Sequence, residues 1–489
     1  MTLSIEDMAT FCKKKGLVYP SSEIYGGMAG FFDYGPYGSE LKKNIKDSWW
    51  KHFVQSREDI VGIDGSIITN PKVWEASGHV ANFKDIMLDC SKCGEKVRAD
   101  VFLEEKLNIA ADGWKADKIN EEIEKNNFVC PKCKGLFKKA EDFNLMFSTN
   151  VGPKKDDSST AYLRPETAQV MFADFKDIVT NARLKLPFGI AQMGKAFRNE
   201  ISPRNFLFRC REFEQLEIEF FIHPKKADEC PFDISETEVN IYSAKMQDEN
   251  QEMKVMKIKD ALKKGIIIKS WHAYWLDQSL QFFIKNSCNI NNFRLRQHIS
   301  TERAHYSTDC WDLEYKFPFG WKELQGIADR GQYDLKQHME HSKKDLSLYD
   351  EESKEKVVPM VICEPSLGLD RTFLVFMYEA YNEDEKRGNT VLKFDSKLAP
   401  IKVGVFPLVN KLKDKARKIY DSLKEDFVCQ YDTSGSVGRR YARADEIGIP
   451  YCITVDFEDD NKVTVRDRDS TKQERVSIDE LKGYLLQKL

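Results

Sequence analysis

The sequence predicts an α+β domain built on an antiparallel sheet, followed by a smaller C-terminal α/β domain, with insertions in the first. Two segments of alternating polarity, GKAFRNE and REFEQLEIEFF, are joined by a polar loop and indicate an antiparallel hairpin. After residue 400, apolar runs such as IKVGVFPLV and YCITVD alternate with helical segments, which indicates a parallel or mixed sheet. The 489 residues are enough for about two to four domains.

Residues 1–86 are predicted to begin the large domain. Their stretch YGGMAGFFDYGPYGS is rich in glycine and indicates turns with close backbone approaches. A helix should follow, because Leu41, Ile45, Trp49 and Phe53 recur at a constant spacing. The β-branched run IVGIDGSIIT then predicts a strand that Pro71 ends, since proline cannot donate inside a ladder.

Residues 87–145 have the composition of an insertion, in which two CxxC pairs flank a highly charged stretch. CSKC and CPKC place Cys90, Cys93, Cys130 and Cys133 at the spacing of a tetrahedral Zn²⁺ site. The gap between the pairs is longer than the usual one, so four unliganded thiols remain the alternative. Four thiolates would close the coordination sphere and make the zinc structural.

The remaining chain divides at changes of composition. Residues 146–221 and 313–381 are predicted to be two halves of the antiparallel core, with a helical insertion at 222–312 between them. A polar linker at 382–399 then leads to the C-terminal domain at 400–489. In that domain we expect a strand, a helix, a strand, a loop and helix, another strand, and a helical C-terminus.

Composition restricts the partners of the protein. The net charge of −4 at pH 7 predicts that any phosphate-binding surface is a local patch. The longest apolar runs are shorter than the roughly 20 residues of a membrane span, so we expect no membrane protein. The first residues have no apolar leader, which favours the cytoplasm, where the twelve cysteines would be reduced or bind metal.

The predicted hairpin has one charged face. Period 2 places Arg198 and Glu200 together on the first strand, and Gln215, Glu217 and Glu219 together on the second. Such a face is costly when dry and unpaired, so it is either solvated or built to hold charged ligands.

A second arginine has an unusual position. GLDR places Arg371 at the start of an apolar helix, where a cation is favourable only beside a bound anion. A surface arginine beside a turn would give the same pattern.

These segments resemble the signature motifs of class II aminoacyl-tRNA synthetases. FRNE with REFEQLEIEFF resembles motif 2, GLDR resembles motif 3, and the helix and strand ending at Pro71 resemble motif 1, whose proline lies at a dimer interface. The resemblance implies a homodimer that binds ATP and Mg²⁺ on the sheet. Arg198 would bind the α-phosphate, Glu200 would recognise the adenine amino group, and Phe213 and Arg371 would stack on the adenine. The implied catalytic residues are Arg198, Glu200 and Arg371. The implied ATP site is Arg198, Asn199, Glu200, Phe208, Arg209, Cys210, Arg211, Glu212, Phe213, Glu323, Leu324, Gly368, Leu369, Asp370 and Arg371.

Further segments resemble the glycyl-tRNA synthetases in particular. They are YGGMAGFFDYGPYG, RAD at 98–100, FNLMF at 143–147, LRPETAQ at 163–169, EPS at 364–366, and the long segment 294–330 that ends in GWKELQGIADR. The resemblance implies that glycine and tRNA(Gly) are substrates, and that carboxylates hold the glycine ammonium where no room is left for a methyl group. The implied glycine site is Arg98, Glu166, Phe213, Glu214, Gln215, Leu216, Glu217, Glu364, Pro365 and Ser366.

The C-terminal segment SGSVGRRYARADEIGIPYCITVD resembles the anticodon-binding domain of several class II enzymes. Arg439, Arg440 and Arg443 would contact tRNA, although a solvated helix face explains each of them equally well. Two other functions stay open. One is a class II synthetase of the prolyl or threonyl type, and the other is a non-catalytic paralogue that only binds nucleic acid and should have lost the arginines that hold ATP.

Overall fold

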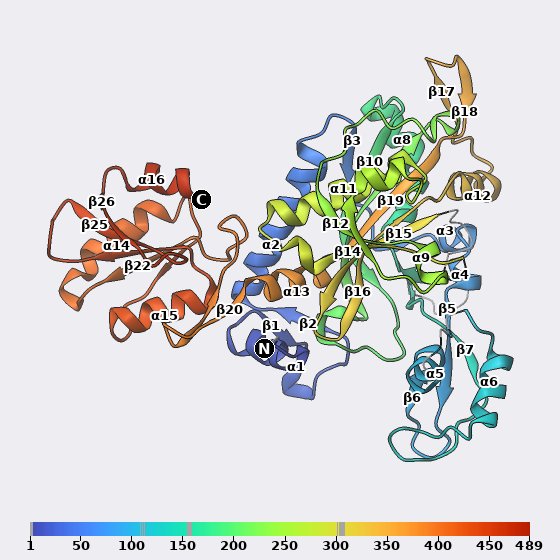
Figure 1. Ribbon diagram of the computed structural model, residues 1–489, viewed down its shortest axis with the longest axis horizontal. Coiled ribbons are helices and arrows are strands. Elements are labelled where there is room, and N and C mark those ends of the chain that lie inside the picture. Colours follow the sequence, from blue (N-terminus) through green and yellow to red (C-terminus); the bar gives the residue numbers. More distant parts are fainter. Residues whose placement is uncertain are drawn as a thin grey trace.

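A nine-stranded sheet forms the centre of the structure, and the C-terminal domain lies beside it at one end of the molecule (Figure 1). The computed structural model describes residues 3–107, 109, 111, 113–153, 159–300, 302 and 309–489. Residues 301 and 303–308 of the segment 294–330 lie outside the described residues. Within the described ranges, none of the helices is long and apolar enough to cross a membrane.

The central sheet is antiparallel, as predicted, except at two places. Strand β3 runs parallel to β10, and β12 runs parallel to β14. The predicted hairpin is the pair β10–β11, with Ala196 opposite Phe213 and Gln192 opposite Glu217. In spatial order the strands are β13 (Lys254–Lys257), β12 (Glu238–Tyr242), β14 (Phe293–Gln297), β15 (Cys310–Phe317), β16 (Gly320–Ala328), β19 (Met360–Gly368), β11 (Glu212–Ile222), β10 (Phe188–Phe197) and β3 (Ile60–Ile63).

Three helices cover one face of this sheet and bury the even-numbered apolar residues of β11. They are α2 (Pro36–Trp50), α11 (Ser270–Lys285) and α13 (Leu369–Ala380). Leu216, Ile218 and Phe220 lie in their common core. The predicted helix from Leu41 to Phe53 is confirmed: α2 continues through a π-helical turn, and all four apolar residues of the pattern are buried. The odd-numbered residues of β11 are therefore left for the opposite face.

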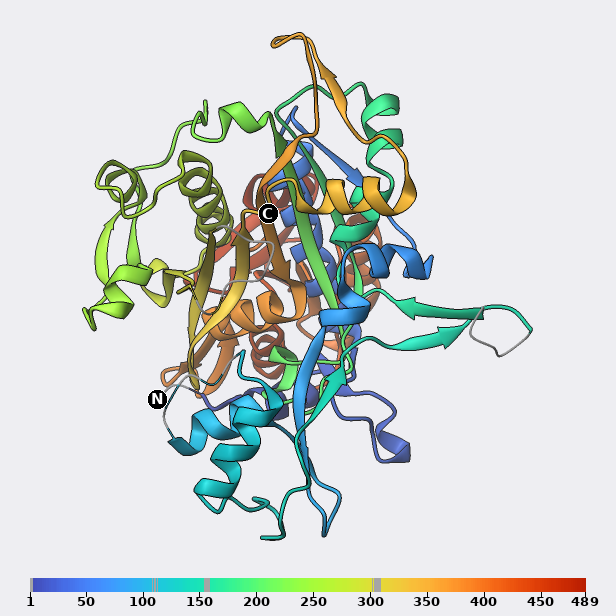
Figure 2. The same ribbon diagram turned by 90° about the vertical axis from the view of Figure 1, so that its right-hand side faces the viewer.

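The elements near the other face are short. α7 (Ala168–Ala173), α8 (Phe175–Ala182) and α12 (Tyr333–Ser342) pack around Phe188, Ile190 and Phe221. α3 (Pro71–Ala76) and α4 (His79–Asn82) precede the cysteine-rich unit. A hairpin of β17 (Leu348–Asp350) and β18 (Glu355–Val357) extends from one end of the body (Figure 2). Near the N-terminus the chain forms α1 (Ile5–Lys14) and a two-stranded sheet of β1 (Val18–Pro20) and β2 (Phe32–Tyr34).

The expectation of a helical insertion at 222–312 is only partly right. This segment contains α9 (Ala244–Asp248), α10 (Ile258–Lys263) and α11, but it also supplies β12, β13 and β14 to the central sheet. The strands were missed because they are short and α11 dominates the local pattern, with Trp271, Trp275 and Phe283 buried in the main core. The segment extends the sheet and is not an appendage to it.

The run IVGIDGSIIT does not form one strand. It divides into β3, in the central sheet, and β4 (Ile68–Thr69), which pairs with β9 (Thr160–Leu163) in a second sheet that also contains β8 (Ser148–Asn150). Pro71 does not end a strand either. It is the first residue of α3, where its missing N–H costs nothing, and Asn70 caps this helix by accepting from the Lys72 amide.

The cysteine-rich segment folds around its own small core. β5 (Lys84–Asp89) pairs with β6 (Lys96–Arg98) and β7 (Glu141–Asn144), and α5 (Ala99–Leu107) and α6 (Ala116–Lys125) pack against them. In Figure 1 this unit lies below the central sheet, away from the C-terminal domain.

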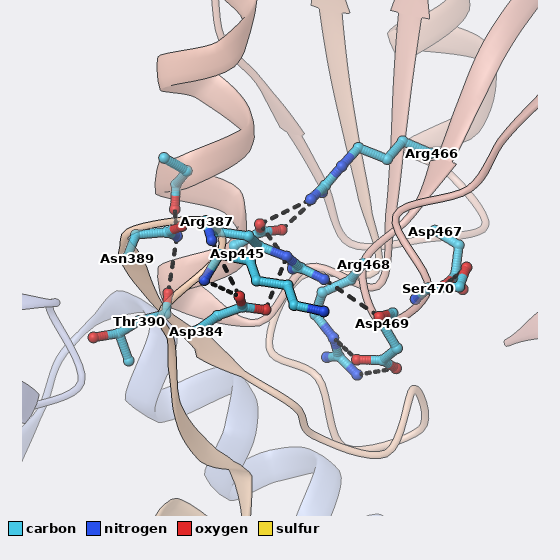
Figure 3. A network of polar contacts seen from close by, with 12 residues as sticks. Asp384, Arg387, Asn389, Thr390, Asp445, Arg466, Asp467, Arg468, Asp469 and Ser470 are labelled. Carbon is cyan, nitrogen blue, oxygen red and sulfur yellow. Dashed lines mark hydrogen bonds and ion pairs between the residues drawn. The ribbon is translucent and has the colours of Figure 1, made fainter.

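The segment predicted as a polar linker is largely a hairpin. β20 (Tyr381–Asp384) pairs with β21 (Asn389–Leu392), and Arg387 in its turn reaches Asp445 of the C-terminal domain at 3.1 Å (Figure 3). Arg466 binds the same buried carboxylate through two contacts of 2.8 and 2.9 Å. The polar composition therefore reflects a docked ion-pair network.

The C-terminal domain has a mixed five-stranded sheet, in the order β23 (Cys429–Tyr431), β22 (Val403–Pro407), β24 (Tyr451–Val455), β25 (Lys462–Asp467) and β26 (Gln473–Ser477). Its first three strands are parallel, with α14 (Lys413–Leu423) and α15 (Val437–Ile447) between them. The predicted helical C-terminus is α16 (Leu481–Lys488), but the antiparallel hairpin β25–β26 precedes it and was not predicted.

Candidate functional site

A cavity opens on the face of the central sheet that α2, α11 and α13 leave uncovered. β11, the loop before it, β16 and the junction of β19 with α13 supply its walls. It is lined by Arg198, Glu200, Leu207, Phe208, Arg209, Cys210, Phe213, Gln215, Glu323, Leu324, Ser366, Gly368, Asp370 and Arg371. The two segments that the sequence singled out, around FRNE and around GLDR, are therefore brought together.

Arg198 lies just beyond the end of β10. The sequence placed Arg198 and Glu200 inside the strand, but β10 ends at Phe197. One further backbone bond, from the Arg198 amide to Arg211 O (2.9 Å), continues the pairing. The Arg198 guanidinium lies 5.3 Å from the centre of the Phe213 ring and donates to Pro165 O at 3.1 Å. The aromatic contact holds this cation in the cavity.

Two more arginines line the same cavity, and each is paired. Arg209 meets Glu200 at 2.9 Å. Arg371 meets Glu323 at 3.1 Å and lies 4.4 Å from the centre of the Phe208 ring. Three guanidinium groups around one cavity favour a polyanion, because each can form two parallel hydrogen bonds to phosphate oxygens.

Several predicted site residues point away from the cavity. Glu214 lies on the reverse side of β11 and pairs with Lys42 (3.0 Å) and Lys46 of α2. Leu216 and Leu369 belong to the main core. The alternation of a strand explains the first two errors, since residues 213, 215 and 217 face the site and residues 214 and 216 do not.

Other predicted residues contribute less directly. Glu212 pairs with Lys195, and Arg211 donates to Ala29 O and Glu200 O. The backbone amide of Asn199 donates a hydrogen bond to Leu145 O. Asp370 borders the cavity, but its carboxylate accepts from Tyr34 and from the Glu214 amide (2.7 Å).

Arg98 lies in the cysteine-rich unit and not in the wall of the cavity. Its guanidinium pairs with Asp100 (2.6 Å) and Asp85 (3.2 Å). It borders a separate groove together with Arg209.

Next to the arginines, the same face of β11 continues into a cluster of buried acidic side chains, which we call the acidic pocket. Glu217 accepts from Thr167, Glu364 meets Arg330 at 2.7 Å, and Glu166 meets His79 at 3.3 Å. Ser366 is directly opposite Glu217 in the neighbouring strand β19 and accepts from Gln215 at 3.2 Å. Pro365 precedes it in the same strand.

The pocket controls the charge of its carboxyl groups. Burial, opposed by Arg330 and reinforced by Glu217 and Glu166, raises the pKa of Glu364 to about 8. Burial also disfavours ionisation of Glu166, but His79, Arg330 and a hydrogen bond from Gln169 outweigh it and lower its pKa. An excess of carboxyl groups over cations makes the pocket suited to a small ligand with a positive charge.

Arg330, His79 and Glu219 also belong to this pocket, and none of them is among the site residues that sequence analysis predicts. Arg330 is only 2% exposed and also holds Asp334 through two bonds of 2.8 Å. The segment GWKELQGIADR was the available signal, but periodicity does not show that its last arginine is fully buried between two acids.

The four predicted zinc ligands converge. Cys90 and Cys133 have their Sγ atoms 3.5 Å apart, those of Cys93 and Cys130 are 3.7 Å apart, and all four lie within 4.8 Å of one another. Zn–S bonds of about 2.3 Å place the sulfurs of a tetrahedral site about 3.8 Å apart. The described cysteines therefore fit a four-thiolate zinc site.

The three C-terminal arginines have different surroundings. Arg440 is buried, and its guanidinium donates to the carbonyls of Pro407, Thr433 and Gly435. Arg443 is partly exposed and pairs with Asp432 at 2.6 Å. Arg439 lies on the exposed side of α15. Arg440 holds loops together and is not free to contact a partner. The prediction that it contacts tRNA is therefore wrong.

Comparisons with known proteins agree with this arrangement. Residues 147–380 match the family model described as "tRNA synthetase class II core domain (G, H, P, S and T)", and residues 402–488 match "Anticodon binding domain". A glycine–tRNA ligase of Clostridium kluyveri is 44% identical over 99% of this chain and 98% of its own length. Another, from Geobacillus thermodenitrificans, is 45% identical over 100% of this chain and 98% of its own length.

Two solved structures share the fold. One is described as the RNA binding domain of threonyl-tRNA synthetase from Cryptosporidium parvum, with a TM-score of 0.60 at 14% identity over 98% of each chain. The other is a Giardia lamblia prolyl-tRNA synthetase in complex with prolyl-adenylate, with a TM-score of 0.58 at 15% identity over 99% of this chain and 77% of that one.

Proposed function

The chain belongs to the glycine–tRNA ligases, class II aminoacyl-tRNA synthetases that activate glycine with ATP and transfer it to tRNA, and we propose that two adjoining sites divide the activation step. ATP would occupy the arginine-lined cavity, and glycine would occupy the acidic pocket beside it. The observation that carries this proposal is the continuous face of β11. Phe213 in the cavity and Glu217 in the acidic pocket lie on this one face, with only Gln215 between them.

The chemistry needs no covalent nucleophile from the enzyme. A carboxylate oxygen of glycine attacks the α-phosphorus of ATP, the bond to pyrophosphate breaks, and glycyl-adenylate forms. Arg198 would stabilise the charge that develops on the α-phosphate, and Arg371 would cover the adenine. Mg²⁺, for which Glu323 at the mouth of the cavity is a suitable oxygen ligand, would neutralise phosphate charge. Catalysis is then positioning together with electrostatics.

Glycine selection would come from the acidic pocket. Glu217, Glu364 and Glu166 would bind the ammonium group, and Ser366 would complete the wall. An apolar pocket distinguishes one methyl group by only about 1–3 kcal/mol, so a rigid wall of ion-paired side chains is the better means of excluding alanine. Arg330 keeps that wall rigid, because it holds Glu364 and Asp334 together.

ATP–pyrophosphate exchange with a panel of amino acids tests this function. We expect exchange with glycine and none with alanine, proline or threonine. Exchange with proline but not glycine would contradict the glycine assignment, and no exchange with any amino acid would favour a paralogue that only binds nucleic acid.

Matched arginine variants test the ATP site. Arg198→Ala should abolish exchange. Arg204→Ala, in the same loop, should retain it, because Arg204 forms an exposed pair with Glu105 (3.0 Å) outside the cavity lining. Full activity of Arg198→Ala would refute the ATP assignment.

The converging cysteines support a structural zinc ion in the same proposal. Gly135 supports it too, since a Cβ atom there would lie 3.2 Å from the sulfurs of both Cys90 and Cys133. Closed coordination by four thiolates would give zinc no part in the reaction. Elemental analysis of the purified protein would test its presence.

The proposal also includes a homodimer, tRNA(Gly) as the acceptor and a cytoplasmic location. Exposed Ile67 and Ile68 lie close in sequence to Pro71, and exposed Val151 follows β8 of the same three-stranded sheet. These apolar side chains suit a subunit interface. Light scattering should give a dimer mass for the wild type and a monomer mass for Ile68→Asp. A dimeric variant would exclude this surface, and a monomeric wild type would exclude the dimer.

A further inference from the structure

Glu219 is a further carboxyl group beside the proposed glycine site. It lies on the same side of β11 as Glu217, which pairs with Ser366 of β19, and the register continued by two residues places Glu219 opposite Glu364. One oxygen from each of Glu217, Glu219 and Glu364 lies within 4.8 Å of the others. Glu219 is completely buried. Three acids are thus gathered at one point of the sheet.

Among the described residues, Glu219 has no ion-pair partner of its own. Neither of its carboxyl oxygens has a hydrogen-bond partner among the residues that the structure describes. The charged groups that face it are Glu217, Glu364, Asp334 and the single cation Arg330. Arg330 forms ion pairs with Asp334 and Glu364, both 2.7–2.8 Å away, and a longer one of 3.9 Å with Glu166. An ionised carboxylate cannot stay dry and unpaired opposite another carboxylate.

A proton resolves this conflict. Burial, reinforced by Glu364, raises the pKa of Glu219 well above its ordinary value. When glycine brings its ammonium group into the pocket, Glu364 can ionise against two cations, Arg330 and the ammonium. Arg330 is the one cation that faces Glu219 among the described residues, and it is already paired with Glu364 and Asp334. Glu219 is therefore the group that keeps its proton, and its O–H would then be a donor beside the acceptor oxygens of Glu217 and Glu364.

We propose that Glu219 is a positioning residue for glycine activation: as a neutral carboxylic acid across the strand from Glu364, it orients the Glu364 carboxylate toward the amino group of glycine. This inference rests on the proposed glycine site. Glu219 does not touch the ammonium itself, and it acts through Glu364.

Three variants separate this role from the alternatives, with ATP–pyrophosphate exchange as the assay. Glu219→Gln keeps the shape and a neutral donor, so KM for glycine should stay within about threefold of wild type. Glu219→Met removes the donor but fills the space, and loss of a hydrogen bond to a charged group should raise KM for glycine by about 10- to 100-fold. KM for ATP should not change in either variant. Glu217→Gln, which alters the proposed ammonium site directly, should lose glycine activation.

The outcomes are distinct. If Glu219→Gln loses activity as Glu217→Gln does, Glu219 acts as an ionised carboxylate and the proposal is wrong. If Glu219→Met matches wild type, the side chain only fills space and the proposal is again wrong. A wild type without glycine-dependent exchange would overturn the proposed function and this inference with it.

Infrared difference spectroscopy gives an independent test that needs only the isosteric variant. The wild type minus Glu219→Gln spectrum should contain the carbonyl stretch of a protonated carboxylic acid at neutral pH. A carboxylate band in its place would overturn the proposal, even if Glu219→Met does not fold.

Discussion

Removal of the buried cation Arg330 should destabilise the central domain. Its side chain is 2% exposed and makes one bond of 2.7 Å to Glu364 and two of 2.8 Å to Asp334. Arg330→Met keeps much of the volume but leaves two buried acids without their cation. Breaking a buried ion pair in this way costs about 3–5 kcal/mol. Glu364 is already largely protonated at neutral pH, because its pKa is raised to about 8. The cost of leaving Asp334 without its cation therefore dominates, and we expect about 3 kcal/mol.

Urea unfolding followed by tryptophan fluorescence would measure this loss, since Trp271, Trp275 and Trp311 are buried in the central domain. The matched control is Arg204→Met. It breaks an arginine–carboxylate pair whose side chains are 42% and 64% exposed, and such pairs contribute less than about 1 kcal/mol. A loss below about 1 kcal/mol for Arg330→Met would show that the buried network does not stabilise the fold, and the reasoning would fail.

Three further predictions address the glycine pocket, the cysteine-rich unit and the C-terminal arginines. Because Glu364 ionises only near pH 8, KM for glycine should fall as the pH rises from about 7 to 9, and a profile flat in wild type and Glu364→Gln alike would contradict this. Purified protein should contain about one zinc per chain, and Cys90→Ser should lower that content and expose the 84–144 unit to proteolysis, whereas the distant Cys429→Ser should not. Arg440→Ala should destabilise the C-terminal domain by about 2 kcal/mol or more. Arg439→Ala should instead raise KM for tRNA without changing the melting temperature. Equal melting temperatures for the two variants would refute the distinction between them.

Sequence periodicity predicted the hairpin at the site correctly but not all of its residues. Alternation placed Gln215 and Glu217 on one face, and the structure has them there. The resemblance to the glycyl-tRNA synthetases covers the whole run around Glu217, so it implies Glu214 and Leu216 as glycine-site residues as well. A strand presents only every second residue of such a run to one side, so the neighbours of a true site residue are the poorest candidates.

Local composition also could not separate a docked charge from a solvated one. Arg439, Arg440 and Arg443 lie close together in one segment, yet Arg440 is 4% exposed and Arg439 is on the surface. The hairpin around Arg387 looked like a linker for the same reason. Burial of these arginines depends on carbonyls and carboxylates that are distant in sequence, such as Pro407 O and the Asp445 side chain.

β11 connects the proposed ATP and glycine sites to helix α2. On its active face it carries Phe213 and Glu217, and on its reverse face Glu214 is held by Lys42 and Lys46 from α2. Because a strand cannot shift on one face without shifting on the other, these lysines also fix the position of the cavity wall. The resemblance placed α2 in motif 1, beside a dimer interface. Contact between subunits would therefore stiffen α2 and, through Glu214, the strand on which ATP and glycine would meet.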